Sequence, residues 1–431
     1  DMFLKDVKVE KQKLNLRPWE CKKIEHKRTT RKNGVFRIVL GFEEIGYKSG
    51  TTYAVLPKPV NPESKNAETP FFGYDATICN TNISLAKSLG GKWWRTCGMN
   101  DNVDISSWER VEPERGKFVW RDDLVDLLNK NKINILATFL FTPKWAAQAP
   151  EDADQGEKWR FKPAELKDWA NFVEAYTRHY KGKIACYEIW NEASGSFFNG
   201  GTAQEFLEFH KIAEKIIRRN DPNAKIMGGA NSFRAGSKVW YDTFVSGGGL
   251  NGIDYYDKHY QVSEREKKEI EATGVKLWQS EFNPHGVSIH PAVEYGPHEK
   301  NKQITRFNNA SSRVVYELGE GRVGVSFYYL SNNYIMDMDR LDYDDIPIRD
   351  FDGGPTTFYI AAAVLARELY HTDSMGKIKL APGIHGYLFK SRDTGSYTAA
   401  LYAPPEELAV SIKFNDDVPA SWRLTSMTGN P

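Results

Sequence analysis

Apolar and polar positions follow a repeated rhythm between about Phe71 and Tyr370. Short apolar runs alternate with longer stretches in which apolar residues recur every three or four positions. The short runs predict buried strands, and the longer stretches predict amphipathic helices, such as Pro163–Tyr180, Ala203–Arg219 and Lys300–Leu318. The eight predicted strands are Phe71–Tyr74, Lys92–Arg95, Ile133–Phe141, Ile184–Trp190, Lys225–Gly229, Ile253–Tyr260, Lys276–Glu281 and Val323–Tyr329.

Eight strands joined by helical crossovers predict an α/β fold, and more narrowly a (β/α)8 TIM barrel. An open doubly wound sheet shares this alternation of elements. However, no glycine-rich phosphate loop follows the first strand, which removes the best-known use of that fold. We therefore place a catalytic barrel in residues 69–375.

The two flanks of the barrel consist of short strand-like runs separated by turn residues. Because one flank precedes the barrel and the other follows it, we expect residues 1–68 and residues 376–431 to meet in one accessory all-β sandwich. The predicted strands of this domain are Val35–Leu40, Thr51–Leu56, Tyr387–Lys390, Tyr397–Tyr402 and Leu408–Phe414.

The charges of the chain balance almost completely, with 58 Lys and Arg against 57 Asp and Glu and a formal net charge of +1. This leaves no electrostatic surplus of the kind that drives binding to nucleic acid or acidic membranes. No apolar run approaches the ~20 residues that span a bilayer. The aromatic content of 13% exceeds what a core of this size commonly needs, so some rings are expected to face an uncharged or mildly charged ligand. The sequence does not indicate an oligomeric state.

The four cysteines, Cys21, Cys79, Cys97 and Cys186, show neither CxxC spacing nor clustering with other metal ligands. Neither a zinc site nor a disulfide framework is predicted, and no cofactor is expected. Cys79 and Cys97 could pair across neighbouring loops, but free buried thiols are the better interpretation. The chain begins with an Asp-Met pair, which is not a translation start. A secreted or periplasmic protein whose signal peptide has been removed is therefore an expectation.

Two glutamates stand at the ends of the fourth and seventh predicted strands. Glu192 closes the segment that starts at Ala185, and Glu281 lies at the end of the segment Val275–Phe282. In a barrel of this kind reactive residues sit at the carboxyl ends of the strands, and strands four and seven face each other across the mouth. Retaining glycoside hydrolysis needs two such carboxylates about 5 to 5.5 Å apart, one as acid/base and one as nucleophile. The sequence therefore predicts this reaction, on an O-glycosidic bond of an oligo- or polysaccharide.

The segment Trp190-Asn191-Glu192, followed by a glutamate that ends strand seven, resembles the clan A retaining glycoside hydrolases. The closest pattern is that of family 39 and its relatives, and the match extends over most of the barrel. The resemblance implies that Glu192 is the acid/base and that Glu281 is the nucleophile. Other segments that carry it are Phe71–Gly73, Trp93–Arg95, Trp108–Gly116, Thr142–Ala146 and Asp257–Tyr260.

Supporting roles follow from the same resemblance, position by position. Asn191 would bind the 2-hydroxyl of the sugar, a contact that strengthens in the transition state. Arg95 and Tyr260 would orient Glu281 and favour its charged form, although Arg95 could also be a purely structural ion-pair partner. His259 would lie near the acid/base or the sugar, and a satisfied core histidine fits this position about as well.

Three tryptophans lie at or near predicted strand ends, where a flat ring can stack on a sugar. Trp145 is the best candidate because it lies in a loop, whereas Trp190 and Trp278 could instead pack inside the barrel layers. At strand eight the family often supplies a tryptophan below the reacting sugar, and Tyr329 is the predicted replacement here. Strand alternation from Glu192 places Glu188 one layer deeper, where a buried structural carboxylate is expected.

Other readings of the same residues remain open. A transglycosylase would use the same glutamates with an acceptor other than water, and a carbohydrate-binding barrel could have lost its activity. Asp257 and His259 lack a third ligand at suggestive spacing, so no metal site is predicted. The sugar, the linkage and the choice between exo and endo action depend on loops that the sequence does not place.

Overall fold

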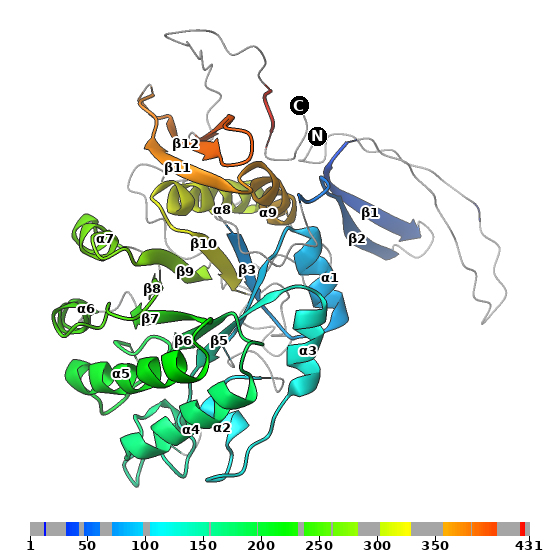
Figure 1. Ribbon diagram of the computed structural model, residues 1–431. Helices are drawn as coiled ribbons and strands as arrows, with labels where there is room; N and C mark the ends of the chain where they lie inside the picture. Colours follow the sequence, from blue (N-terminus) through cyan, green and yellow to red (C-terminus); the bar gives the residue numbers. More distant parts are fainter. Residues whose placement is uncertain are drawn as a thin grey trace.

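The fold is described from a computed structural model of residues 13, 32–42, 47–60, 71–97, 104–154, 157–195, 197–231, 237–259, 262–282, 302–328, 357–380, 382–402 and 423–426 (Figure 1). Eight parallel strands form a closed barrel in the order β10-β3-β4-β5-β6-β7-β8-β9. Each of the eight predicted strands overlaps one of these, so the predicted TIM barrel is confirmed. The strands are β3 Phe71–Asp75, β4 Trp93–Thr96, β5 Asn134–Phe139, β6 Cys186–Ile189, β7 Lys225–Asn231, β8 Tyr255–Lys258, β9 Lys276–Phe282 and β10 Gly324–Tyr328.

Helices surround the barrel, and local sequence signals set where several of them begin. Thr202 and Ser263 each accept a hydrogen bond from the backbone of a glutamate three residues later, which completes a capping box at α5 and at α7. Helix α4 begins at Leu166 rather than at Pro163, because Pro163 is engaged in a short bridge with Ala147. The helices are α1 Asn80–Ser88, α2 Trp108–Val111, α3 Asp122–Lys130, α4 Leu166–His179, α5 Ala203–Asn220, α6 Ser237–Ser246, α7 Glu264–Glu271, α8 Lys302–Gly319 and α9 Thr357–Glu368.

Side chains inside the barrel form layers. The lowest layer is apolar and contains Trp93, Leu136, Cys186, Met227 and Trp278. The layer above it is polar and lies at the carboxyl ends of the strands, where the loops of such a barrel build its functional face. A much larger apolar cluster fills the space between the strands and the helices.

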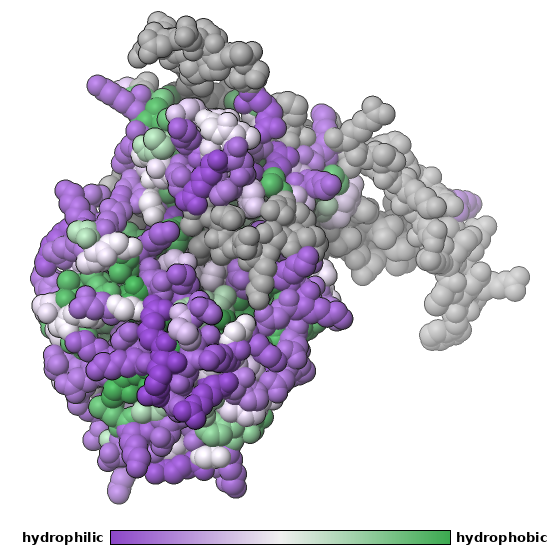
Figure 2. Space-filling model, viewed as in Figure 1, coloured by the Kyte–Doolittle hydropathy of each residue, from purple (hydrophilic) through white to green (hydrophobic). Residues whose placement is uncertain are grey.

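The helical surface is largely polar. Figure 2 shows a hydrophilic face over the helices, with apolar residues in small separate patches. This is the surface expected when each amphipathic helix turns its apolar stripe toward the strands. Among the described helices, none is both long and apolar enough to cross a membrane.

The terminal segments form two separate antiparallel sheets. Strands β1 Gly34–Phe42 and β2 Tyr47–Val55 pair with each other and pack against α9. Strands β11 Thr372–Lys377, β12 His385–Ser391 and β13 Tyr397–Tyr402 form the second sheet, which packs against α8.

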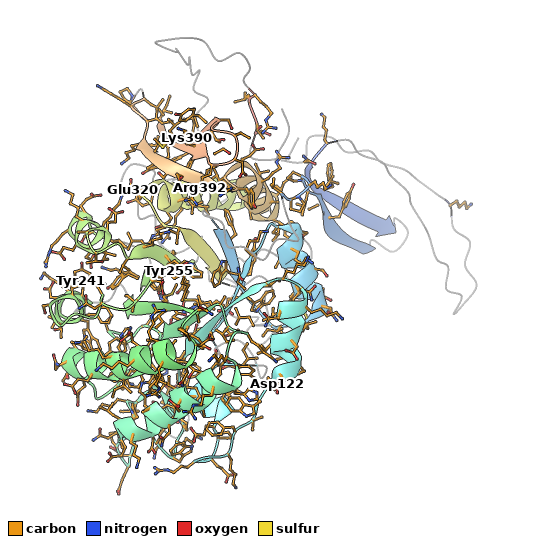
Figure 3. All side chains as sticks on the ribbon, in the orientation of Figure 1. Asp122, Tyr241, Tyr255, Glu320, Lys390 and Arg392 are labelled. Atoms are coloured by element: carbon orange, nitrogen blue, oxygen red, sulfur yellow. The ribbon has the colours of Figure 1, made fainter. Side chains whose placement is uncertain are left out.

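The C-terminal sheet fits an accessory β domain. The hydroxyl of Tyr387 on β12 donates to Glu320, just after α8, at 2.6 Å and ties this sheet to the barrel. Figure 3 labels Glu320 at the level of α8, below Lys390 of β12. Whether both terminal segments build a single sandwich stays a prediction. The predicted strand Leu408–Phe414 lies outside the described residues.

Three cysteines are free thiols in the structure: Cys79, Cys97 and Cys186. A bridge between Cys79 and Cys97 is therefore not formed. The thiols of Cys97 and Cys186 are buried, and burial raises the pKa of both well above the usual value. These two cysteines behave as small core residues.

Candidate active site

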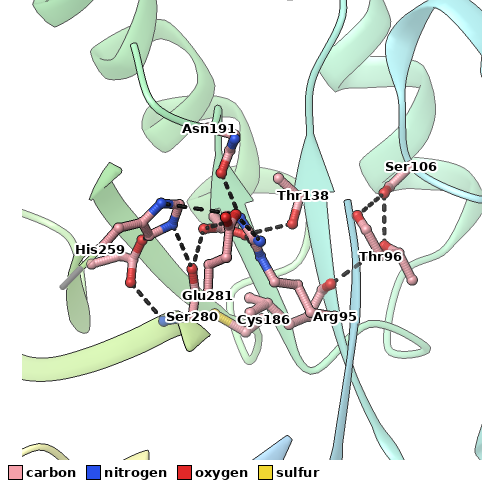
Figure 4. A network of polar contacts seen from close by, with 12 residues as sticks. Arg95, Thr96, Ser106, Thr138, Cys186, Asn191, His259, Ser280 and Glu281 are labelled. Carbon is pink, nitrogen blue, oxygen red and sulfur yellow. Dashed lines mark hydrogen bonds and ion pairs between the residues drawn. The ribbon is translucent and has the colours of Figure 1, made fainter. Parts of the chain in front are cut away.

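Arg95 is the centre of the polar layer at the barrel mouth (Figure 4). Its fully buried guanidinium extends from β4 and donates through Nε and Nη2 to the two oxygens of Glu188, at 2.9 and 3.1 Å. Nη2 also donates to Oδ1 of Asn191 at 2.6 Å, and Nη1 donates to Oε2 of Glu281 at 3.1 Å. One planar cation therefore fixes three side chains from two other parts of the barrel.

Glu188 lies at the floor of this layer and is fully buried. Besides Arg95, it accepts hydrogen bonds from the hydroxyls of Thr138 at 2.5 Å and Ser280 at 2.9 Å. All of these partners come from the barrel strands β4, β5 and β9. Glu188 is thus the buried structural carboxylate that strand alternation predicted.

An irregularity in β9 turns two consecutive residues into the barrel. Val325 and Phe327 of β10 are two residues apart. Their partners on β9, Gln279 and Phe282, are three residues apart. The extra residue on β9 is a β-bulge, which re-aims side chains and is common beside active sites. Ser280 contacts Glu188 and the next residue, Glu281, contacts Arg95, although neighbours in a regular strand point to opposite faces.

The end of β6 is strained in a way that directs the other glutamate. Trp190 and Glu192 have φ angles of 72° and 41°, in the left-handed region that side chains other than glycine seldom adopt. The indole of Trp190 is held in the core and donates to the carbonyl oxygen of Phe197 at 2.7 Å. This anchored turn presents Asn191 and Glu192 to the polar layer. The Nδ2 of Asn191 is buried and has no hydrogen-bond partner among the described residues.

His259 joins the two predicted catalytic glutamates. Its Nδ1 lies 3.0 Å from Oε1 of Glu192 and 3.8 Å from Oε2 of Glu281, and its Nε2 lies 3.1 Å from Oδ2 of Asp257. Burial by itself would lower the pKa of this imidazole, but the negative charges of Glu281 and Asp257 outweigh burial and raise the pKa well above its usual value. Burial raises the pKa of Asp257, yet His259 and Arg95 reverse this and leave that pKa below its usual value.

Glu192 and Glu281 are close together and reach solvent. One oxygen of each carboxylate and one nitrogen of His259 all lie within 4.8 Å of one another. The side chains of Glu192 and Glu281 are 13% and 11% exposed, whereas those of Glu188 and Asp257 are 0% exposed. Of these four acids, the two glutamates at the strand ends are therefore the ones that a ligand can reach.

The same cluster has the spacing of a metal site, as does the buried group of Glu188, Asp257 and His259. A histidine must lose its proton before it can bind a metal. Here the surrounding carboxylates favour the protonated ring. The carboxylates around His259 thus favour a protonated imidazole over a bound metal ion.

The predicted sugar contacts of two tryptophans are wrong. Trp190 is fully buried against aromatic residues of the helical layer, including Trp169 and Phe209. Trp278 is fully buried in the lowest layer of the barrel, edge-on to Trp93. Both rings pack inside the protein because successive positions along a strand point alternately to the barrel interior and to the helices, which proximity to a strand end does not reveal.

Trp145 is half-buried beside the mouth of the barrel. Its indole donates to the carbonyl oxygen of Glu112 at 3.0 Å, and the guanidinium of Arg115 lies over the ring at 4.9 Å. The guanidinium thus covers one face of the ring. Stacking of the other face on a sugar stays a prediction. Tyr260 and Tyr329 lie outside the described residues.

Asp75, at the end of β3, is a member of the polar layer that the sequence reasoning missed. It is 5% exposed, and burial raises the pKa of its carboxyl to about 7, with the positive charge of Arg95 opposing that rise. The available signal was an acidic residue that directly follows an apolar strand on the same edge of the barrel as Arg95.

Comparisons with known proteins agree with this fold. Residues 81–273 match the sequence model of the glycosyl hydrolases of family 39. Among curated proteins, no sequence matches this chain.

Several solved structures share the fold. A family 39 glycoside hydrolase from the gut symbiont Bacteroides cellulosilyticus WH2 aligns with a TM-score of 0.67 at 16% identity, over 90% of this chain and 81% of that one. A monomeric β-xylosidase from Caulobacter crescentus CB15 aligns with a TM-score of 0.52 at 15% identity, over 79% and 73% of the two chains. A family 39 enzyme from Xanthomonas axonopodis pv. citri gives a TM-score of 0.51 at 15% identity, over 78% and 74%. The family 39 sequence pattern and the barrel together support a glycosidase, and residues 81–273 of the chain are similar to the clan A glycoside hydrolases of family 39.

Proposed function

We propose that the protein hydrolyses O-glycosidic bonds of an oligo- or polysaccharide with net retention, through a covalent glycosyl-enzyme. The observation that carries this proposal is the approach of Glu192 and Glu281 to within 4.8 Å. Retaining enzymes hold their two carboxyl groups about 5 to 5.5 Å apart, whereas inverting enzymes need about 6.5 to 9.5 Å to fit a water molecule between acid and sugar. The separation here supports direct attack by a carboxylate.

In the first step, an oxygen of Glu281 attacks the anomeric carbon while Glu192 gives its proton to the glycosidic oxygen. The bond between the anomeric carbon and that oxygen breaks, and the leaving group departs as an alcohol. In the second step, Glu192, now ionised, takes a proton from water. The resulting hydroxide attacks the anomeric carbon, and the carboxylate of Glu281 leaves. Two inversions at one carbon give net retention.

The neighbouring groups support these roles. Arg95 donates to Oε2 of Glu281 and so orients the proposed nucleophile and balances its negative charge. His259 holds the proposed acid/base by Oε1. The Nδ2 of Asn191, which has no hydrogen-bond partner among the described residues, is available to donate to the 2-hydroxyl of the sugar. A buried donor without a partner costs about 1 to 3 kcal/mol, and a bound sugar would remove that cost.

Covalent labelling tests the proposal directly. The fluorine of a 2-fluoro aryl glycoside slows both steps, whereas a good leaving group speeds only the first. The glycosyl-enzyme therefore accumulates. The probe panel should include a β-xyloside, because the similar Caulobacter structure is named as a β-xylosidase. We expect mass spectrometry to show one added glycosyl group on the peptide that contains Glu281.

Three variants serve as controls. Glu281→Gln should not be labelled, whereas the exposed Glu208→Gln should be labelled like the wild type. Glu192→Ala should still react with aryl glycosides whose leaving groups need no protonation, but it should lose activity toward natural glycosides. NMR of the first-formed product should show the anomeric configuration of the substrate. Inverted product, or label on a residue other than Glu281, would exclude this mechanism.

A further inference from the structure

Asp75 has no part in the mechanism above, yet it lies in the same polar layer. Its side chain is buried, and its Oδ2 has no hydrogen-bond partner among the described residues. Buried polar atoms in folded proteins are nearly always hydrogen-bonded, and an exception calls for an explanation. A group that is satisfied only when a ligand binds is one such explanation.

The sheet register places Asp75 beside Arg95. Gly73 pairs with Trp93 and Tyr74 pairs with Trp94 in the parallel strands β3 and β4, so the next pair along the strands is Asp75 and Arg95. Tyr74 belongs to the cluster between strands and helices. Because neighbours along a strand point to opposite faces, Asp75 points into the barrel, as Arg95 does.

The guanidinium of Arg95 does not hold Asp75 by a hydrogen bond. The hydrogen bonds of Arg95 go to Glu188, Asn191 and Glu281, and none goes to Asp75. The fields of Glu281 and Glu188 also act on the Asp75 carboxyl and disfavour its negative charge. Among the described residues, this acid therefore lies near the reacting centre without the hydrogen bonds to both oxygens that a structural carboxylate such as Glu188 has.

We propose that Asp75 binds a hydroxyl group of the sugar whose glycosidic bond is cleaved, and that it helps to decide which sugar the site accepts. This inference rests on the proposed function. A carboxyl group can accept a hydrogen bond from a sugar hydroxyl or, when protonated, donate one. Asp75 extends from β3, whereas Asn191 follows β6, so the two reach different hydroxyls of one ring.

Deoxy substrates test this contact. The experiment takes the best aryl glycoside for the wild type and its monodeoxy analogues, one for each hydroxyl other than the 2-hydroxyl. A site that hydrogen-bonds a hydroxyl discriminates strongly against the analogue that lacks it. We expect one deoxy position to lower kcat/KM of the wild type by at least about tenfold. In Asp75→Ala and Asp75→Asn, kcat/KM for the full substrate should already be reduced, and removal of that same hydroxyl should cost little more.

Asp221→Asn is the matched control. Asp221 is also a buried acid, but its Oδ2 accepts hydrogen bonds from the backbone of Gly182 and the hydroxyl of Tyr187. Its variant should change stability without changing the order of the deoxy substrates. An effect of Asp221→Asn on the same deoxy position would show that loss of a buried acid acts through the fold, and would overturn the proposal.

The outcomes for Asp75 separate this inference from the proposed function. If Glu281 of the wild type is not labelled by the 2-fluoro glycoside, the proposed function itself fails. If labelling occurs but the Asp75 variants show the same loss at every deoxy position as the wild type, only the role of Asp75 is refuted. Failure of both Asp75 variants to fold, with circular dichroism as the readout, would assign Asp75 a structural role and would also overturn it.

Discussion

Replacement of Arg95 by methionine is expected to reduce the free energy of unfolding by about 3 to 5 kcal/mol, the cost of leaving a buried charge without its partner. Methionine keeps much of the volume of the side chain but removes every donor. Glu188 would lose two of its four described hydrogen bonds and keep those from Thr138 and Ser280. Glu281 and Asn191 would lose one bond each.

The magnitude follows from the burial of Glu188. Hydrogen bonds to charged groups contribute about 1.5 to 3 kcal/mol each, so four separate losses would sum to more than the expected range. The four losses do not add in full, because Glu281 is partly exposed and can form a hydrogen bond with water instead. The larger part of the cost therefore comes from the carboxylate of Glu188, whose side chain is 0% exposed.

Urea unfolding of a double-mutant cycle measures this cost. Glu188→Gln keeps the shape of the side chain and removes its charge, so the pair Arg95→Met with Glu188→Gln should be at least about 1.5 kcal/mol more stable than the sum of the single effects predicts. Arg95→Lys should recover only part of the loss, because an ammonium cannot make the planar two-point contact. A loss below about 1 kcal/mol for Arg95→Met, or additive effects in the cycle, would refute the reasoning.

Three further predictions concern the same region. The pKa of the Asp75 carboxyl is raised to about 7 in the native protein, so this group holds its proton more tightly than it does in the unfolded chain. The wild type should therefore lose stability relative to Asp75→Asn as the pH rises from about 4 to about 7. The loss should be on the order of 4 kcal/mol in urea titrations at fixed pH. The pKa of His259 is raised, so its stabilising effect is complete below its unfolded pKa of about 6.5 and disappears as the pH rises through the folded value. His259→Gln should thus destabilise the protein more at pH 6 than at alkaline pH in thermal unfolding, and an equal loss at both would contradict the assignment. Trp278→Ala should cost about 3 to 5 kcal/mol of stability, and a selective rise in KM without that loss would show that Trp278 contacts substrate after all.

Local patterns were sufficient for the barrel and for its two proposed catalytic acids. Each barrel strand is a short apolar run, and a strand that is buried on both faces can be recognised by such a run within its own segment. Glu192 and Glu281 could be found because a carboxyl end of a strand is the functional edge of this fold whatever the details of packing. Strand alternation also placed Glu188 correctly below Glu192.

Tertiary structure alone decided which way several other side chains face. The bulge in β9 brings Ser280 and Glu281 to the same side, and it arises from the register with β10, which is not a property of either strand by itself. Trp190 and Trp278 sit next to the catalytic edge in the sequence but fill two different cores. In the described part of the chain, Oδ2 of Asp75 is left without a partner, since Arg95 is already engaged by three other residues. Hydrogen-bond partners and burial are shared among segments far apart in the chain, so a single segment cannot determine them.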